Sequence, residues 1–296
     1  MVRSIVAALV VLTCTTAQLA WADRTPQPAR PVLNWMSNYQ KAYQRAADTK
    51  RMLLVYFQSD DKSSLCRQFE EESLADERVV EQLRDYVLVK LPLDTKIKVE
   101  GEEVRLLEHR AFEDLHKKPG IAVVDLTDDE EDHHGDVVSV VPLAEGRYYR
   151  FRPNHVAVLL DLPEGTLTQR TMTFAVRIHP ESPESTLGQA DPVLMEAAKD
   201  HSRHQARIQN QGHHNWSSRF QHISSRLPDG LHAQEVVAES WPHQSLLDAA
   251  VDCVHSWRQS SGHWGAVRAK QPRFGYDIRR GGNGIWYATG LFGNRN

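Results

Sequence analysis

The sequence is poor in cysteine, in long hydrophobic runs and in excess charge of either sign. It has three cysteines among 296 residues, which excludes a small scaffold held together by several disulfides. The formal net charge is -4, which argues against a nucleic-acid partner bound through bulk phosphate neutralisation. Hydrophobic residues make up 41% and charged residues 25%, an ordinary globular composition, and the length allows two domains.

Residues 1–22 read as a secretory signal. Arg3 gives a charged start, an apolar core follows, and Ala20, Trp21 and Ala22 form a small-x-small cleavage site. The apolar run is shorter than the ~20 residues of a membrane span, so we expect no transmembrane segment in the mature chain. The sequence therefore predicts cleavage after Ala22 and a secreted or periplasmic protein.

A lipoprotein signal is the alternative reading of this leader. Cys14 would be the lipidated residue, but Thr13 before it fits such a signal poorly. Cleavage after residue 22 would leave Cys66 and Cys253. These fall in different predicted domains, so we expect two free thiols, with Cys253 a small buried side chain.

The region 30–162 has the pattern of an α/β domain. Apolar runs typical of buried strands are separated by segments with helical periodicity. A helix is predicted between Trp35 and Lys50, another between Ser64 and Arg84 with a break near Asp76, and a closing helix at 155–162. The predicted strands cover 52–57, 86–93, 120–126 and 136–143. Strand, helix, strand and a strand pair predict a mixed sheet covered by helices.

This region resembles the thioredoxin-like family. The run LLVYF is followed by Ser63, Ser64, Leu65 and Cys66 where the family has its redox loop, and Lys118-Pro119 precedes GIAVVDL as the family's cis-proline loop does. The family's loop is CxxC, and Ser63 stands in place of the attacking cysteine. A hydroxyl cannot form the mixed disulfide of dithiol exchange. The resemblance thus implies a redox-inactive scaffold, with single-cysteine chemistry through Cys66 as an alternative.

Between 163 and 190 the chain connects two predicted domains. The stretch TQRTMTFAVRIH alternates like a strand and also fits one helical face, and a cap at Thr166 or Thr168 favours the helix. HPESPEST then interrupts the chain with prolines and marks the boundary. Earlier, the acidic run 128–132 with His133 and His134 reads as a solvated hairpin turn rather than a metal site.

The region 191–296 has several well-marked elements. Asp191 and Pro192 cap a helix that continues to Ile208, and Gly212 follows its end. We expect its His201 and His204 to face solvent. A second helix runs through 246–257, with Glu239 before it and a small-residue turn to His263 after it. The last segment predicts a hairpin, FGYDI to GIWYATGLFG, around a glycine-rich turn.

Four ordered motifs in this region resemble the cysteine-rich secretory, antigen 5 and pathogenesis-related (CAP) superfamily, especially its compact bacterial branch. They are GHHNW with Arg219, VVAESW, WRQSSGHW and the final hairpin. The resemblance implies an α-β-α sandwich with a central cleft. If the cleft residues of the superfamily are carried over, the first histidine corresponds to His213, or to His214 in the alternate register. The acidic residue then corresponds to Glu239 and the second histidine to His263. The second acidic residue of many members has no equivalent after Trp257.

Two neutral imidazoles and a carboxylate can form a metal site or an acid–base pair. They can hold Zn²⁺ with an open position for water, which makes His213, His263 and Glu239 a hypothetical metal set. Without metal, a carboxylate beside an imidazole positions it as an acid or base. Neither arrangement supplies a nucleophile. The leading hypothesis is a cleft that binds an unidentified extracytoplasmic ligand or protein, and the alternative is a divalent-metal-dependent hydrolase.

Overall fold

The computed structural model describes residues 33–59, 63–99, 101–143 and 151–295. The predicted signal at 1–22 and Cys14 lie outside these residues. Residues 33–296 form one compact unit, so the predicted boundary at 163–190 stays a prediction. No helix in the described ranges combines the length and the apolar composition needed to cross a membrane.

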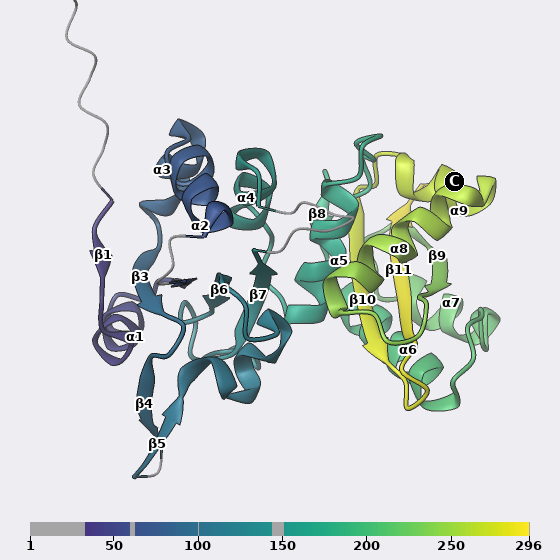
Figure 1. Ribbon diagram of the computed structural model, residues 1–296. Coiled ribbons are helices and arrows are strands. Elements are labelled where there is room, and N and C mark those ends of the chain that lie inside the picture. Colours follow the sequence, from purple (N-terminus) through teal and green to yellow (C-terminus); the bar gives the residue numbers. More distant parts are fainter. Residues whose placement is uncertain (1–32, 60–62, 100, 144–150, 296) are drawn as a thin grey trace, which may run out of the picture. The chain divides into compact units, whose positions relative to one another are not determined.

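A five-stranded sheet lies at the centre of the first half of the described chain (Figure 1). Its strand order is β1-β3-β2-β6-β7. Strands β1, β3 and β2 pair parallel to one another, and β6 pairs antiparallel with both of its neighbours, β2 and β7. The strands are β1 (Trp35–Met36), β2 (Leu53–Gln58), β3 (Val87–Pro92), β6 (Gly120–Val124) and β7 (Val137–Pro142).

Both faces of this sheet are buried, which explains its unbroken apolar runs. Along β2, Leu54 and Tyr56 point into a core with the helices after it, whereas Val55 and Phe57 point into a core with the helix before it. The covering elements are α1 (Tyr39–Asp48), α2 (Ser64–Gln68), a π-helical turn (Phe69–Ser73), α3 (Glu77–Leu83), the 3₁₀ turns Leu106–Glu108 and Arg110–Leu115, and α4 (Pro153–Leu160).

Most predicted elements of this half are confirmed, with local differences. The first helix begins at Tyr39 rather than Trp35, because Asn38 caps it and Trp35 pairs with β3. The predicted break at Asp76 is the cap of α3. A short hairpin, β4 (Lys96–Val99) and β5 (Glu102–Arg105), was not predicted because its residues are mostly charged.

Two further expectations for this half are wrong. No described peptide bond is cis, so the bond before Pro119 is trans, unlike the family's cis-proline loop. His133, expected in a solvated turn, is buried beside the carboxylate of Asp125. The turn folds back on the end of the sheet, since Gly135 and Asp136 exchange backbone hydrogen bonds with Asp125.

A second sheet, in the order β8-β10-β11-β9, has helices on both faces (Figure 1). Its strands are β8 (Gln189–Ala190), β9 (His232–Glu239), β10 (Arg273–Arg280) and β11 (Trp286–Asn294). Along β11, Ala288 and Phe292 enter the core with α5, α8 and α9, and Leu291 enters the core with α6 and α7. The helices are α5 (Leu167–Arg177), α6 (Pro192–Ile208), α7 (Trp216–Ser224), α8 (Leu246–Gln259) and α9 (Ser261–Arg268).

The ambiguous connecting segment is a helix, as predicted. Thr166 and Gln169 form a capping box at the start of α5. Phe174 packs in the core of the first sheet, whereas Met172 packs in the core of the second. The fully buried guanidinium of Arg170 donates to Ser139 of β7 and to backbone carbonyls before α5. This helix therefore belongs to the packing of both sheets.

Candidate binding site at a pair of histidines

The centre of the site is Glu235, in the middle of β9. Its side chain is 1% exposed. An ionised carboxylate at this depth needs partners, and two are present. Nδ1 of His213 lies 2.9 Å from Oε1, and the guanidinium of Arg219 donates to Oε2. Burial alone would raise the pKa of Glu235, but these hydrogen bonds outweigh it and hold that pKa below its ordinary value.

His213 and His263 form the accessible part of the site, which we call the imidazole pair. Their ring centroids are 5.8 Å apart. His213 lies between α6 and α7, and His263 lies in the first turn of α9. The side chain of His213 is 43% exposed. Its Nδ1 faces Glu235, so its Nε2 is the nitrogen free to meet a ligand.

The pKa of His263 is lowered, chiefly by burial and further by the neighbouring His213 ring. At neutral pH this ring is an uncharged imidazole with a lone pair. The imidazole pair therefore suits a hydrogen-bond donor or a soft cation better than an anion.

His201 on α6 packs behind the site, next to Gly212 and Glu235. The prediction that His201 faces solvent is wrong. The residue is 2% exposed. Its Nε2 lies 2.9 Å from the carbonyl of Gly212 and 3.8 Å from Oε1 of Glu235. Burial lowers the pKa of His201 to about 4, although Glu235 acts in the opposite direction. His201 is thus a neutral donor that fixes the backbone just before His213.

The carboxylate assigned to the cleft needs a correction. Glu239 is exposed at the end of β9, and the carboxylate that contacts His213 is Glu235. Both residues lie on the same face, because side chains alternate along a strand. Only Glu235 sits deep enough to need buried partners. Strand alternation in HAQEVVAE places both carboxylates on one face, so it gives no signal that distinguishes Glu235 from Glu239.

His214, which the alternate register would place in the cleft, lines a separate pocket. Its Nε2 faces the carbonyl of Asn210 at 3.1 Å, and its ring lies 5.5 Å from that of His204. This histidine pocket, between α6 and α7, has a volume of about 520 Å³. Its histidines are His201, His204, His214 and His222. The structure therefore separates His214 from the imidazole pair.

The predicted metal set is not assembled as expected. Among the residues that the structure describes, no group of three or more His, Cys, Asp or Glu side chains is placed to hold a metal ion. The imidazole pair supplies two nitrogen ligands, and the nearest carboxylate, Glu235, is already occupied by Arg219 and His213. A zinc site of the catalytic kind has three protein ligands.

The loop that corresponds to the redox loop of the thioredoxin-like family holds a buried thiol. Cys66 is 4% exposed in α2. Ser63 caps this helix, since its hydroxyl accepts a hydrogen bond from the Cys66 N–H at 3.2 Å. Burial raises the pKa of Tyr56, whose hydroxyl also interacts with Cys66. The position of the attacking cysteine is thus used for helix capping.

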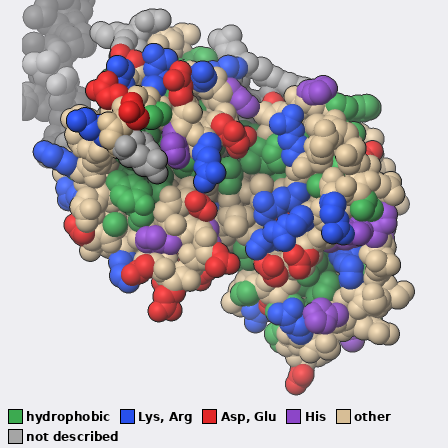
Figure 2. All heavy atoms as spheres, turned by 90° about the horizontal axis from the view of Figure 1, so that it is seen from below, with side chains coloured by type: hydrophobic (Ala, Val, Ile, Leu, Met, Phe, Trp, Pro, Cys, Tyr) green, Lys and Arg blue, Asp and Glu red, His purple; other side chains and the backbone are tan. Residues whose placement is uncertain are grey.

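Charges of both signs lie on the face of the molecule that Figure 2 presents. Figure 2 shows Lys and Arg side chains interspersed with Asp and Glu on the face that it presents. A broad surface of one sign is not seen on that face.

One comparison with known protein families bears on the first sheet. A family model described as thioredoxin-like matches residues 34–125, so this part of the chain is a thioredoxin-like domain. The comparison with curated proteins gave no match. Among solved structures, an outer surface protein from Borrelia burgdorferi is 18% identical, with a TM-score of 0.30, covering 37% of this chain and 78% of its own.

Proposed function

We propose that this is an exported two-domain binding protein. Its C-terminal domain, of CAP type, binds a ligand at the imidazole pair, and its thioredoxin-like domain acts as a scaffold without dithiol chemistry. The motifs GHHNW, VVAESW and WRQSSGHW support the CAP assignment. The two-faced helical cover of the second sheet is consistent with it.

One observation carries the binding proposal. A buried carboxylate, Glu235, orients His213, and His263 lies beside it with its ring 5.8 Å away. Orienting a ring through a buried carboxylate is useful when the other ring nitrogen meets a ligand. A ring needed only for packing would gain nothing from 43% exposure of its side chain.

Zn²⁺ alone is a suitable probe of this site, because a histidine that binds metal commonly donates its other N–H to a carboxylate. With two protein nitrogens, binding should be weak. Titration calorimetry on the full chain should show binding that His213→Ala or His263→Ala reduces by about tenfold or more. His116→Ala, an exposed histidine of the first half, is the control. Equal binding by all four proteins, or none at all, would contradict the proposal.

A hydrolase acting at the imidazole pair is the second candidate. The Glu235–His213 hydrogen bond favours it, since such a pair can act as a general base. The metal dependence expected from the sequence has less support, because the imidazole pair supplies two of the three protein ligands of a catalytic zinc site. The test of this candidate is hydrolysis of a peptide or an envelope polymer by the full chain with added Zn²⁺. Activity lost in His263→Ala would support it. Activity that persists in this variant would argue for a contaminant.

The scaffold role of the first domain has its own test. Insulin reduction by the full chain should match the uncatalysed rate, because Ser63 cannot attack a disulfide. Turnover that disappears in Cys66→Ser would contradict the scaffold role. A mixed disulfide trapped in cells, and absent in the same variant, would instead establish the single-cysteine alternative.

Export is tested by the N-terminus of the protein recovered from cells. Cleavage after Ala22 predicts a mature chain that begins at Asp23. N-terminal sequencing decides this directly. A product that begins at Met1, or at a lipid-modified Cys14, would contradict cleavage after Ala22.

A further inference from the structure

A cavity of about 710 Å³ lies where the first sheet's turns and helices meet α5 and the start of α6. We call it the junction cavity. Its size is within the range of small-molecule sites, and such sites are frequent where packed units meet. It is separate from the imidazole pair, and none of the residues assigned to that site lines it.

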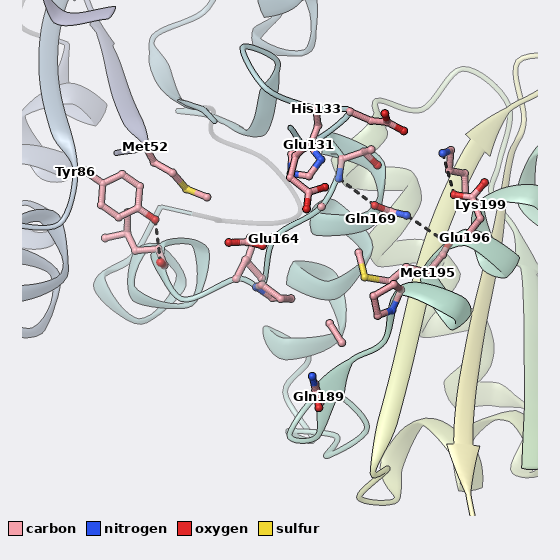
Figure 3. Close-up of a pocket in the computed structure, with 18 residues that line it drawn as sticks. Met52, Tyr86, Glu131, His133, Glu164, Gln169, Gln189, Met195, Glu196 and Lys199 are labelled. Carbon is pink, nitrogen blue, oxygen red and sulfur yellow. Dashed lines mark hydrogen bonds and ion pairs between the residues drawn. The ribbon is translucent and has the colours of Figure 1, made fainter. Parts of the chain in front are cut away.

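The walls of the junction cavity combine apolar and polar side chains. Figure 3 shows Met52 and Tyr86 on one side and Met195 on the other, with Glu164 between them. The hydroxyl of Tyr86 is turned away to the carbonyl of Leu160, at 2.9 Å. Two methionine side chains are flexible and polarisable, so they adapt to an apolar ligand body.

The charges at the cavity are unbalanced. Lys199, the one lysine among the described lining residues, is paired with Glu196 at 3.0 Å. Glu131, Asp132 and Glu164 also line it, and no described residue forms an ion pair with any of them. Within the described part of the chain, the lining therefore holds three carboxylates without an ion-pair partner, next to apolar side chains such as Met52 and Met195.

A buried imidazole adds a polar atom without a hydrogen bond. His133 is 8% exposed and lines the cavity beside Glu131 (Figure 3). Its Nε2 lies 3.2 Å from Oδ2 of Asp125, but the geometry gives no hydrogen bond. This nitrogen is itself closed off from solvent and faces Asp125, so His133 forms part of the cavity wall with the rest of its ring.

We propose that the junction cavity binds a small organic amine, with its ammonium group among the carboxylates of Glu131 and Glu164 and its apolar body between Met52 and Met195. Charge complementarity selects a cation over an anion. The methionine-lined walls select an amine with an apolar body over an inorganic cation. Binding of this kind is independent of the ligand proposed for the imidazole pair.

The test uses 4-phenylbutylamine as the probe and 4-phenylbutyrate as its anionic counterpart, with the full chain labelled at the methionine methyl groups. NMR titration should shift the Met52 and Met195 signals with the amine, at a millimolar Kd. Met172, which is 0% exposed in the core, should not move. The carboxylate should shift none of them. The affinity should fall with rising salt, since the carboxylates are at the rim.

A charge-matched pair of variants makes the test specific. Glu131→Gln with Glu164→Gln should weaken amine binding about three- to tenfold, the sum of two exposed ion pairs. Glu71→Gln with Glu102→Gln, both exposed and away from the cavity, should leave it unchanged. Equal losses in both double variants, equal binding of the carboxylate, or no shift of Met52 and Met195 at about 10 mM amine would overturn the proposal.

Discussion

Glu235 and Glu239 lie four residues apart on one face of β9, yet Glu235 is buried against His213 and Arg219 while Glu239 is exposed. Position along the strand thus decides which carboxylate belongs to the site. The two residues also provide a matched pair of substitutions.

Glu235→Gln should lower the free energy of unfolding by about 1–3 kcal/mol, because Arg219 would lose its charged partner in a buried setting. Glu239→Gln should change it by less than about 0.5 kcal/mol, as expected for an exposed position. Urea unfolding monitored by circular dichroism measures both. The reverse order would mean that Glu239, not Glu235, is the buried partner.

His201 should make stability depend on pH. Its pKa is lowered to about 4 from 6.5, so between these values the unfolded chain binds the proton more readily. The contribution of His201 to the free energy of unfolding is therefore fully present above pH 6.5 and is lost as the pH falls towards 4. The buried ring His179 and the lowered pKa of His263 act in the same direction. Glu235 adds a loss as the pH falls further, through its lowered folded pKa.

The measurement is urea unfolding across this range for the parent protein and His201→Gln. The variant should be less stable at pH 7.5, since it loses the hydrogen bond to Gly212. Its stability should fall less between pH 6.5 and pH 4. An unchanged slope would assign the dependence to other groups.

Asp277 on β10 holds two helices on the second sheet. Its carboxylate accepts hydrogen bonds from Thr168 at the start of α5 and from Ser202 of α6, and it pairs with Arg279 at 2.9 Å. Burial raises the pKa of Asp277, although these partners act in the opposite direction. Asp277→Ala should destabilise the protein by about 2–4 kcal/mol, because buried donors lose their acceptor. Thermal unfolding checks this, and Arg279→Ala, a partly exposed partner, should have the smaller effect.

Replacing Gly275 or Gly265 by alanine should change the stability of the protein in opposite directions. A Cβ on Gly275 would lie 2.4 Å from the backbone of Leu194, so Gly275→Ala should push α6 off the sheet and destabilise it by about 1–3 kcal/mol. Gly265 lies inside α9 with open space around it, so Gly265→Ala should stabilise by about 0.5–1 kcal/mol. Melting temperatures measured in parallel decide the sign. An unchanged or raised melting temperature for Gly275→Ala would contradict the close packing of α6.

The two described cysteines should react slowly with iodoacetamide in the folded protein. Cys66 is 4% and Cys253 0% exposed, and burial raises the pKa of Cys253. Peptide mass spectrometry should show little modification of either thiol in buffer and full modification in urea. Rapid labelling of Cys66 alone would reopen single-cysteine chemistry at that position.

The sequence by itself determined the elements that depend on local chemistry. Apolar runs located β2 and β3, Asp191 and Pro192 located the start of α6, and the glycine-rich turn located the final hairpin. The resemblance of four motifs to the CAP superfamily implied that His213 and His263 lie in one cleft, and the structure places their ring centroids 5.8 Å apart. The departure at Ser63 was likewise readable, since the loop lacks its first cysteine.

Only the tertiary structure decided which polar groups are buried. His201 and His133 lie in segments that look polar in the sequence, yet both are buried once α6 packs on the sheet and the acidic turn folds back. The choice of Glu235 over Glu239 and the junction cavity have the same origin. Burial depends on contacts between segments far apart in the chain, and no local pattern carries that information.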